Sequence, residues 1–192
     1  MKGLRTVALA LVGALALSGC SLVPTASAPE PLSGSHIPFG LLNRTIPGTN
    51  GQRVRFITQP VYIVDATGHL APSSRIVPSP PNLATVLRQL ILGPTQIETA
   101  AGYSSALPRN LVVVSASIKN SIAAIDLATS LSSLPISRQI LAAGQLALTA
   151  NDVGAVNGIE VLVGGVPQAT LLPNHTRSRV VLVSDFQRLA NG

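Results

Sequence analysis

The chain has little of several residues that proteins use for disulfide bonds, metal binding or stacking. Its 192 residues include one cysteine, three histidines, no tryptophan, two tyrosines and three phenylalanines. A single cysteine excludes an internal disulfide, and the histidines lack the close spacing of metal ligands, which argues against a zinc centre. So few aromatic side chains leave little to stack on sugars or bases. The composition therefore predicts no metal or other cofactor.

Charged residues are also scarce, at 10% of the chain, and the basic ones are scattered. There are 13 Lys and Arg against 7 Asp and Glu, and the nearest approaches to basic clusters are Arg53 with Arg55 and Arg177 with Arg179. A nucleic-acid-binding protein gathers its basic residues on one face. We therefore expect no nucleic-acid partner, and only a weak attraction to anionic lipid or wall polymer.

No uninterrupted apolar run is long enough to cross a membrane, but a short one precedes the single cysteine. Lys2 and Arg5 lead into an apolar stretch over residues 6–16, and Leu17-Ser18-Gly19 then leads to Cys20. The stretch is much shorter than the roughly 20 residues that a spanning helix needs. It is typical of a secretory signal that ends in a lipobox. An ordinary cleaved signal with an accidental cysteine is the alternative.

A lipobox predicts cleavage before Cys20 and attachment of a diacylglyceryl group to its thiol. Two acyl chains hold a protein on a membrane firmly, whereas one does so only marginally. We therefore expect a lipid-anchored protein on the extracytoplasmic side of the cell membrane.

Turn-forming residues divide the chain into segments. Residues 21–38 are rich in Pro, Ser and Ala, and residues 47–51 form a second run of turn formers. Such composition is typical of a flexible tether. The predicted organisation is a signal peptide (1–19), a lipidated N-terminus and tether (20–54), a folded domain (55–173), and a C-terminal strand and tail (174–192).

Local patterns predict strands joined by hairpins, with two helices. The clearest element is a helix over residues 82–92, whose apolar residues recur at helical spacing, with Asn82 as its cap and Gly93 and Pro94 at its end. A second helix is expected from Ser132 and Ser133, with Pro135 in its first turn, to residues 151–154. Within it, the mid-helix Gly144 predicts a close approach by another element. The expected apolar row of this helix is Ile136, Ile140, Ala143 and Ala147.

The expected strands cover residues 56–64, 70–77, 111–118, 122–127, 159–163, 166–172 and 180–183, followed by a fraying end. The connection at 119–121 is expected to have three residues, and Gly164-Gly165 to form a two-residue turn. Residues 95–110 are expected to be irregular. This order predicts an α+β fold, mostly antiparallel sheet from hairpins with two helices packed on it.

Few residues have the pattern of catalytic machinery. Gly102-Tyr103-Ser104-Ser105-Ala106 lacks the second glycine of a nucleophile elbow, and no glycine-rich loop between strand and helix is present to hold phosphate. A carboxylate pair cannot be read from sequence, so a hydrolase using Glu98 and Asp126 stays open. For Glu98 we favour a structural role, in which it accepts backbone N–H bonds and fixes the loop that follows.

Several stretches together resemble the GerMN domain, the sporulation and spore-germination module of actinobacterial and other Gram-positive lipoproteins. They are Val61-Tyr62-Ile63-Val64-Asp65, Arg75, Leu90-Ile91-Leu92-Gly93-Pro94-Thr95 with Glu98, Gly102-Tyr103-Ser104-Ser105-Ala106-Leu107-Pro108, Ala124-Ile125-Asp126-Leu127, Gln145 and Thr149. The resemblance covers residues 55–172. One departure is that residues 128–134 lack the aromatic that the family often has beyond its Asp-Leu pair.

The resemblance implies an extracytoplasmic α+β domain of a family with no established enzymatic activity, and it suggests contact with other proteins as the role; we therefore expect no enzyme. The candidate structural or interaction residues are Arg75, Gly93, Pro94, Glu98, Gly102, Ser105, Pro108, Asp126 and Gln145. We expect envelope proteins as partners, with self-association as an open possibility. Two further hypotheses remain: a lipoprotein that captures a small glycan or peptide, and an envelope hydrolase.

Overall fold

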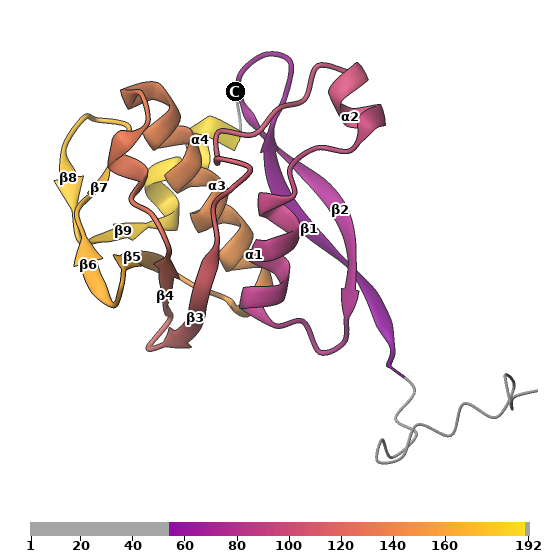
Figure 1. The fold of residues 1–192 in the computed structure, drawn as a ribbon, viewed down its shortest axis with the longest axis horizontal. Coiled ribbons are helices and arrows are strands. Elements are labelled where there is room, and N and C mark those ends of the chain that lie inside the picture. The colour runs from indigo at the N-terminus through magenta and orange to yellow at the C-terminus, as the bar shows by residue number, and fades with distance from the viewer. Residues whose placement is uncertain (1–53, 191–192) are drawn as a thin grey trace, which may run out of the picture. The chain divides into compact units, whose positions relative to one another are not determined.

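The computed structural model describes residues 54–190 (Figure 1). The predicted signal peptide, Cys20 and tether lie outside these residues. The elements are β1 (Phe56–Val64), β2 (Leu70–Pro78), α1 (Leu83–Ile91), α2 (Gln96–Ala100), β3 (Val113–Lys119), β4 (Ile122–Leu127), the 3-10 turn η3 (Leu131–Ser133), α3 (Ile136–Gly154), β5 (Gly158–Val163), β6 (Val166–Gln168), β7 (Thr170–Leu171), β8 (Arg177–Ser178), β9 (Val180–Leu182), the 3-10 turn η4 (Val183–Phe186) and α4 (Gln187–Ala190).

The strands form a long hairpin, a larger sheet and a short third pair. β1 and β2 pair antiparallel over their full length, from Phe56 opposite Pro78 to Val64 opposite Leu70. The larger sheet has the order β3-β4-β5-β6, and β9 also pairs with β5. Only β4 and β5 are parallel among the paired strands of residues 54–190, and α3 makes the crossover between them. The α+β fold with mostly antiparallel strands is therefore confirmed.

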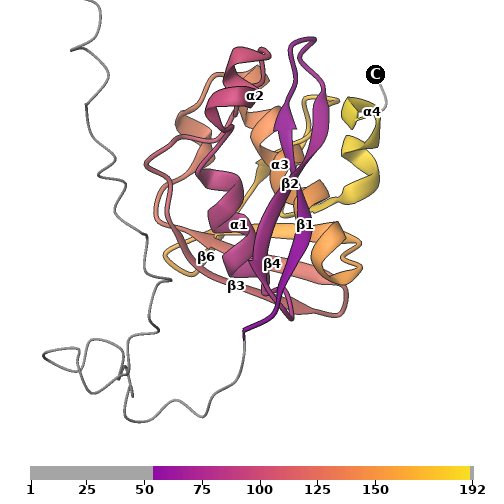
Figure 2. The ribbon, with the colours of Figure 1, turned by 90° about the vertical axis from the view of Figure 1, so that its right-hand side faces the viewer.

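The centre of the domain is α3, which lies between the β1–β2 hairpin and the larger sheet (Figures 1 and 2). All residues from 142 to 150 are buried, because the helix is covered on more than one side. The expected single apolar row is therefore wrong for the first turn, where Ile136 is 57% exposed. The helix also begins later than expected, since Pro135 is its N-cap and not part of its first turn.

Gly144 makes the close approach that its position in the helix predicts. A Cβ atom there would lie 2.7 Å from Cδ1 of Leu70 and 3.1 Å from Cδ1 of Phe186. Phe186 itself is completely buried. The expected strand over residues 180–183 is confirmed as β9, which extends the larger sheet. The expectation of a fraying end after it is wrong for residues 183–190, because the 3-10 turn that follows places the ring of Phe186 against α3.

The turns follow local sequence closely, with one correction. Gly164 and Gly165 both have positive φ, as the predicted two-residue turn requires. The β3–β4 connection is also a two-residue turn and not the expected three, because Lys119 already pairs with Ile122. Its residues Asn120 and Ser121 have φ of 51° and 60°.

Among the helices of residues 54–190, none has the length and apolar character needed to cross a membrane.

Candidate functional site

Most of the candidate residues meet around the segment that joins α1 to β3, residues 92–112, here called the α1–β3 connection. Two left-handed glycines shape it, Gly93 with φ 76° and Gly102 with φ 87°. At Gly102 a Cβ atom would also lie 2.9 Å from the Cβ atom of Ala66, so a larger residue would collide with the β1–β2 turn. The connection is thus held close to the tip of the hairpin.

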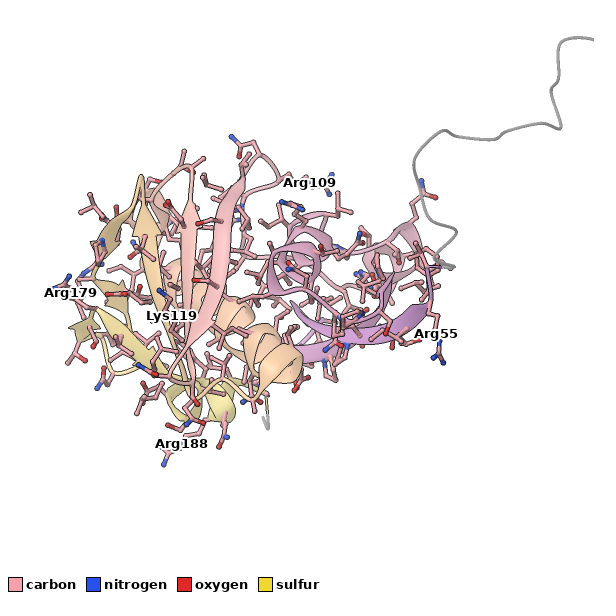
Figure 3. All side chains as sticks on the ribbon, turned by 90° about the horizontal axis from the view of Figure 1, so that it is seen from below. Arg55, Arg109, Lys119, Arg179 and Arg188 are labelled. Atoms are coloured by element: carbon pink, nitrogen blue, oxygen red, sulfur yellow. The ribbon has the colours of Figure 1, made fainter. Side chains whose placement is uncertain are left out.

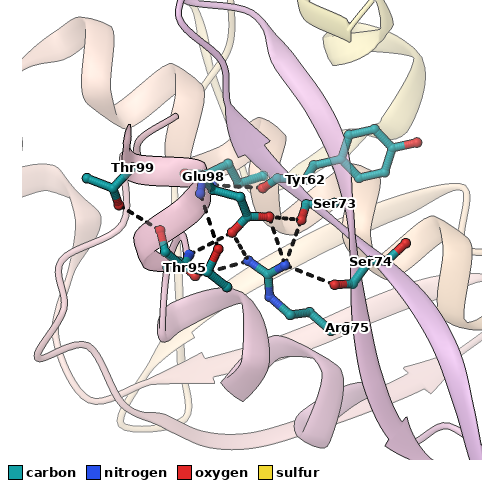
Figure 4. Close-up of polar contacts among 9 residues, drawn as sticks. Tyr62, Ser73, Ser74, Arg75, Thr95, Glu98 and Thr99 are labelled. Carbon is teal, nitrogen blue, oxygen red and sulfur yellow. Dashed lines mark hydrogen bonds and ion pairs between the residues drawn. The ribbon is translucent and has the colours of Figure 1, made fainter. Parts of the chain in front are cut away.

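An ion pair fixes the first part of the connection to β2 (Figure 4). Arg75 donates from Nη1 to Oε1 of Glu98 and from Nη2 to Oε2, both at 3.0 Å. The Arg75 Nη2 group also donates to the carbonyl of Gly93 at 3.1 Å. This two-pronged geometry is the strong form of an arginine–carboxylate contact. Arg75 thereby connects the end of α1 and the helix α2 to the same strand.

Glu98 is also the centre of a capping box at the start of α2. Its Oε2 accepts the N–H of Thr95 at 2.6 Å, and its own N–H donates to the Thr95 hydroxyl at 3.3 Å. The Ser73 hydroxyl donates to Oε1 as well. Glu98 accepts a backbone N–H, as expected, but it is that of Thr95 at the start of α2. None of its side-chain hydrogen bonds within the described residues reaches the loop that follows, which it was expected to fix.

These contacts set the charge of Glu98. Partial burial on its own raises the pKa of the carboxyl, but the hydrogen bonds from Arg75, Ser73 and Thr95 outweigh it. The pKa falls from 4.5 to about 2. Glu98 is therefore ionised and fully engaged at neutral pH, which does not suit a general acid.

The second part of the connection is bonded to β1 and α3. Ser104 and Val64 exchange both backbone hydrogen bonds, at 2.7 and 2.9 Å. The side chain of Gln145 is completely buried and accepts the N–H of Ala106 through Oε1 at 2.8 Å. Arg138 donates from Nη2 to the carbonyl of Ala106 at 3.2 Å.

The structure brings together Arg75, Gly93, Pro94, Glu98, Gly102, Ser105, Pro108 and Gln145 around this connection, but not Asp126. The carboxylate of Asp126 lies on β4 and accepts the N–H of Gly165 at 3.0 Å. Glu98 and Asp126 thus belong to separate hydrogen-bond networks. Within residues 54–190, no cluster of three or more His, Cys, Asp or Glu side chains is placed to hold a metal ion.

Two parts of this site were missed by sequence analysis. The helix α2 falls in a stretch expected to be irregular, although Thr95-Gln96-Ile97-Glu98 is the pattern of a capping box. That pattern could have located the helix and the bonds of Glu98. Arg138, by contrast, lies on an exposed part of α3 and nothing in its local sequence marks it.

Two hollows flank the connection. One, the α1–β3 hollow, has a volume of about 330 Å³ and lies beside α1 and β3; Arg88, Leu92, Arg109 and Val112 are among its lining residues. The other, the loop cavity, has a volume of about 260 Å³ and includes Gly93, Pro94, Tyr103, Arg109 and Arg138 in its lining. Arg109 and Ile91 line both. The candidate residues therefore form or support the walls of a hollowed surface.

The fold and the site define an α+β domain whose surface connection is fixed by side chains from β2 and α3. The family model described as Germane, sporulation and spore germination, matches residues 60–169. The chain belongs to this family. No curated protein matches the chain.

Three solved structures are similar to the chain at low sequence identity. The tandem GerMN domains of the sporulation protein GerM from Bacillus subtilis have a TM-score of 0.48 and 17% identity, over 62% of this chain and 43% of that one. The first GerMN domain of the same protein has a TM-score of 0.45 and 15% identity, over 58% of this chain and 86% of that one. A lipoprotein from Clostridium perfringens has a TM-score of 0.42 and 18% identity, over 71% of this chain and 93% of that one. The chain thus aligns with less than half of the tandem structure.

Proposed function

We propose that this protein is a lipid-anchored lipoprotein on the extracytoplasmic side of the cell membrane, and that its Germane domain binds other proteins without catalysing a reaction. The work of the domain would lie in sporulation, germination or cell-envelope assembly, as the family description suggests. The anchor is proposed from the lipobox at Cys20 alone.

One observation supports protein binding most directly: apolar side chains are exposed around the α1–β3 connection. Leu92 is 71% exposed, Ile97 83% and Val112 56%. Leu92 and Val112 line the α1–β3 hollow, with Arg88 and Arg109 also in its lining. Apolar side chains beside arginines are typical of protein interfaces, where arginine is enriched and large exposed apolar patches mark contact sites.

The hydrogen bonds that already engage the polar side chains support a non-catalytic role. Glu98 is held by Arg75, Ser73 and Thr95, and Gln145 by two backbone groups. A general acid or base needs a proton that it can exchange near the working pH, and a carboxyl with a pKa of about 2 does not meet that need. These side chains hold the shape of the surface.

Crosslinking in cells, followed by purification from native membranes, tests the proposal. The wild type is compared with Cys20→Ala, with Val112→Glu in the α1–β3 hollow, and with Val166→Glu, a matched control at a 60% exposed residue on β6. We expect the same envelope proteins with the wild type and Val166→Glu, and their loss with Cys20→Ala and Val112→Glu. If the same proteins are crosslinked in all four samples, the result would contradict both the anchor and the proposed surface.

A further inference from the structure

The loop cavity has properties that a purely structural connection does not require. Its volume is about 260 Å³, and its apolar lining includes Pro94, Leu107 and Pro108. Hydroxyl-bearing residues, among them Thr99 and Tyr103, also line it. A concave site with apolar walls and a few convergent polar groups is the usual form of a small-ligand site. At this volume it suits a group the size of one or two amino-acid residues.

The charge of the cavity has one sign. Arg109 and Arg138 both line it, and none of its lining residues within the described part of the chain is acidic. Glu98 precedes the lining residue Thr99, but its carboxylate is already paired with Arg75, as Figure 4 shows. The positive charge of the two arginines therefore faces the cavity without a nearby free carboxylate in its wall, which favours an anionic ligand.

Arg138 is oriented by hydrogen bonds to the connection and has donors that these bonds do not use. Its hydrogen bonds within residues 54–190 run from Nη2 to the carbonyls of Ala106 and Ser105, at 3.2 and 3.5 Å. A guanidinium has five N–H donors in a rigid fork, so Nη1 and Nε keep theirs for a ligand. Carboxylates match this fork with two parallel hydrogen bonds.

We propose that the loop cavity binds the terminal carboxylate of a peptide, with Arg109 and Arg138 on the carboxylate and the apolar wall on the last side chain. The apolar wall favours this ligand over a free inorganic anion, which would leave the half-buried rings of Pro94 and Pro108 without a partner. This inference deepens the proposed function, because it names the chemical group by which a protein or peptide partner is held.

The test compares two probes that differ only in their C-terminal group, which is a carboxylate in one and a neutral carboxamide in the other. Full-length protein in detergent is titrated with N-acetyl-Ala-Leu as the free acid and as the carboxamide, by isothermal calorimetry or by NMR shift changes of the Arg side chains. We expect the acid to bind at least tenfold more tightly than the carboxamide. Equal binding of the two, or no binding of the acid, would overturn the inference. Competition by inorganic phosphate at the affinity of the peptide would also overturn it, because the apolar wall would then contribute nothing.

Variants locate the site. Arg109→Gln removes a charge without removing a hydrogen bond to the connection in the described structure, so it should weaken the acid at least tenfold while the melting temperature stays within about 2 °C. Arg138→Lys keeps the charge but loses the fork, and should weaken binding by a smaller factor. The matched control is Arg179→Gln, which removes the same charge at a position well away from Arg109 (Figure 3). Equal effects of Arg109→Gln and Arg179→Gln would overturn the site.

The two proposals fail in different ways. If the acid and the carboxamide bind alike while the wild type still crosslinks to envelope proteins, the cavity inference is wrong and the proposed function stands. If the acid binds selectively but the anchored protein has no protein neighbours in cells, the inference stands and the proposed function is wrong.

Discussion

Tyr62 and Gln145 are joined by a hydrogen bond of 2.8 Å, from Nε2 of Gln145 to the carbonyl oxygen of Tyr62. One helical turn further along α3, the hydroxyl of Thr149 accepts the N–H of Tyr62 at 3.0 Å. The helix therefore supplies both partners that another strand would supply to β1 at this point. Two residues further along β1, Val64 exchanges both backbone hydrogen bonds with Ser104, so the same edge of the strand is also paired there.

Replacing Gln145 by Leu should destabilise the domain. Because Gln145 is completely buried, the variant would leave the carbonyl of Tyr62 and the N–H of Ala106 without partners. Each unpaired buried group costs about 1–3 kcal/mol, so for the two groups we expect a loss of about 2–6 kcal/mol in the free energy of unfolding by urea. The exposed residue Gln187 gives the control, and Gln187→Leu should change that free energy by less than about 0.5 kcal/mol. Similar losses for both variants would contradict the prediction.

The Glu98 carboxyl should make stability depend on pH in acid. Its pKa in the folded domain is about 2, below its ordinary value of 4.5. A lowered pKa contributes stability that is present above pH 4.5 and is lost as the pH falls towards 2. With solvent screening of this partly exposed pair, the loss should be about 1–2 kcal/mol.

Glu98→Gln tests this dependence, because the variant cannot titrate at that position. Urea unfolding at pH 7 should show the variant to be less stable than the wild type, and the difference should shrink at pH 2.5. Glu160→Gln, the same change on β5, serves as the matched control. A gap between wild type and Glu98→Gln that stays constant from pH 7 to pH 2.5 would show that the pair does not set the pKa.

Gly144→Ala should destabilise the core even though alanine is the better helix former. Alanine gains about 1 kcal/mol in helix propensity, but overpacking a full core costs about 1–3 kcal/mol. The new methyl group would lie 2.7 Å from Cδ1 of Leu70. We expect a net loss of about 1 kcal/mol in thermal unfolding, partly restored by adding Leu70→Val. Ser137→Ala, on an exposed position of the same helix, should be neutral or slightly stabilising.

Asp126→Ala should loosen the β5–β6 turn without greatly reducing global stability. The Asp126 carboxylate accepts the N–H of Gly165, and this is its one hydrogen bond within the described residues. Losing a bond of about 1.4 kcal/mol should speed exchange of the Gly165 amide hydrogen about tenfold, as measured by NMR. Asp126→Asn keeps an acceptor oxygen and should exchange at nearly the wild-type rate. Unchanged exchange in the alanine variant would show that the carboxylate does not hold the turn.

The sequence predicts the parts of the fold that local chemistry determines. The β1–β2 hairpin and helix α1 follow from apolar spacing and from the cap at Asn82, whose Oδ1 accepts the N–H of Thr85. The full burial of α3 could not be predicted, because its composition does not reveal that elements pack on both sides. The pairing of Gln145 with Tyr62 spans 83 positions, and no local pattern marks such a contact.

The candidate site was predictable only as a set of residues. The resemblance to a family pointed to Arg75 and Glu98, but their shared ion pair depends on how β2 and α2 meet. Asp126 belonged to the same set, and the structure places it in a different hydrogen-bond network. Arg138, which lines the loop cavity, had no local signal because its hydrogen bonds depend on the course of a segment 32 and 33 residues earlier.

The position of Phe186 has a consequence for how the chain matures. Its ring packs against Gly144, yet it follows β1–β9 and α1–α3 along the chain. During synthesis, the strands and helices that precede it emerge first and carry an uncovered apolar notch until residue 186 follows. A chain cut short before this residue should therefore be recognised by chaperones and proteases as unfinished, even though it contains every residue of the α1–β3 connection.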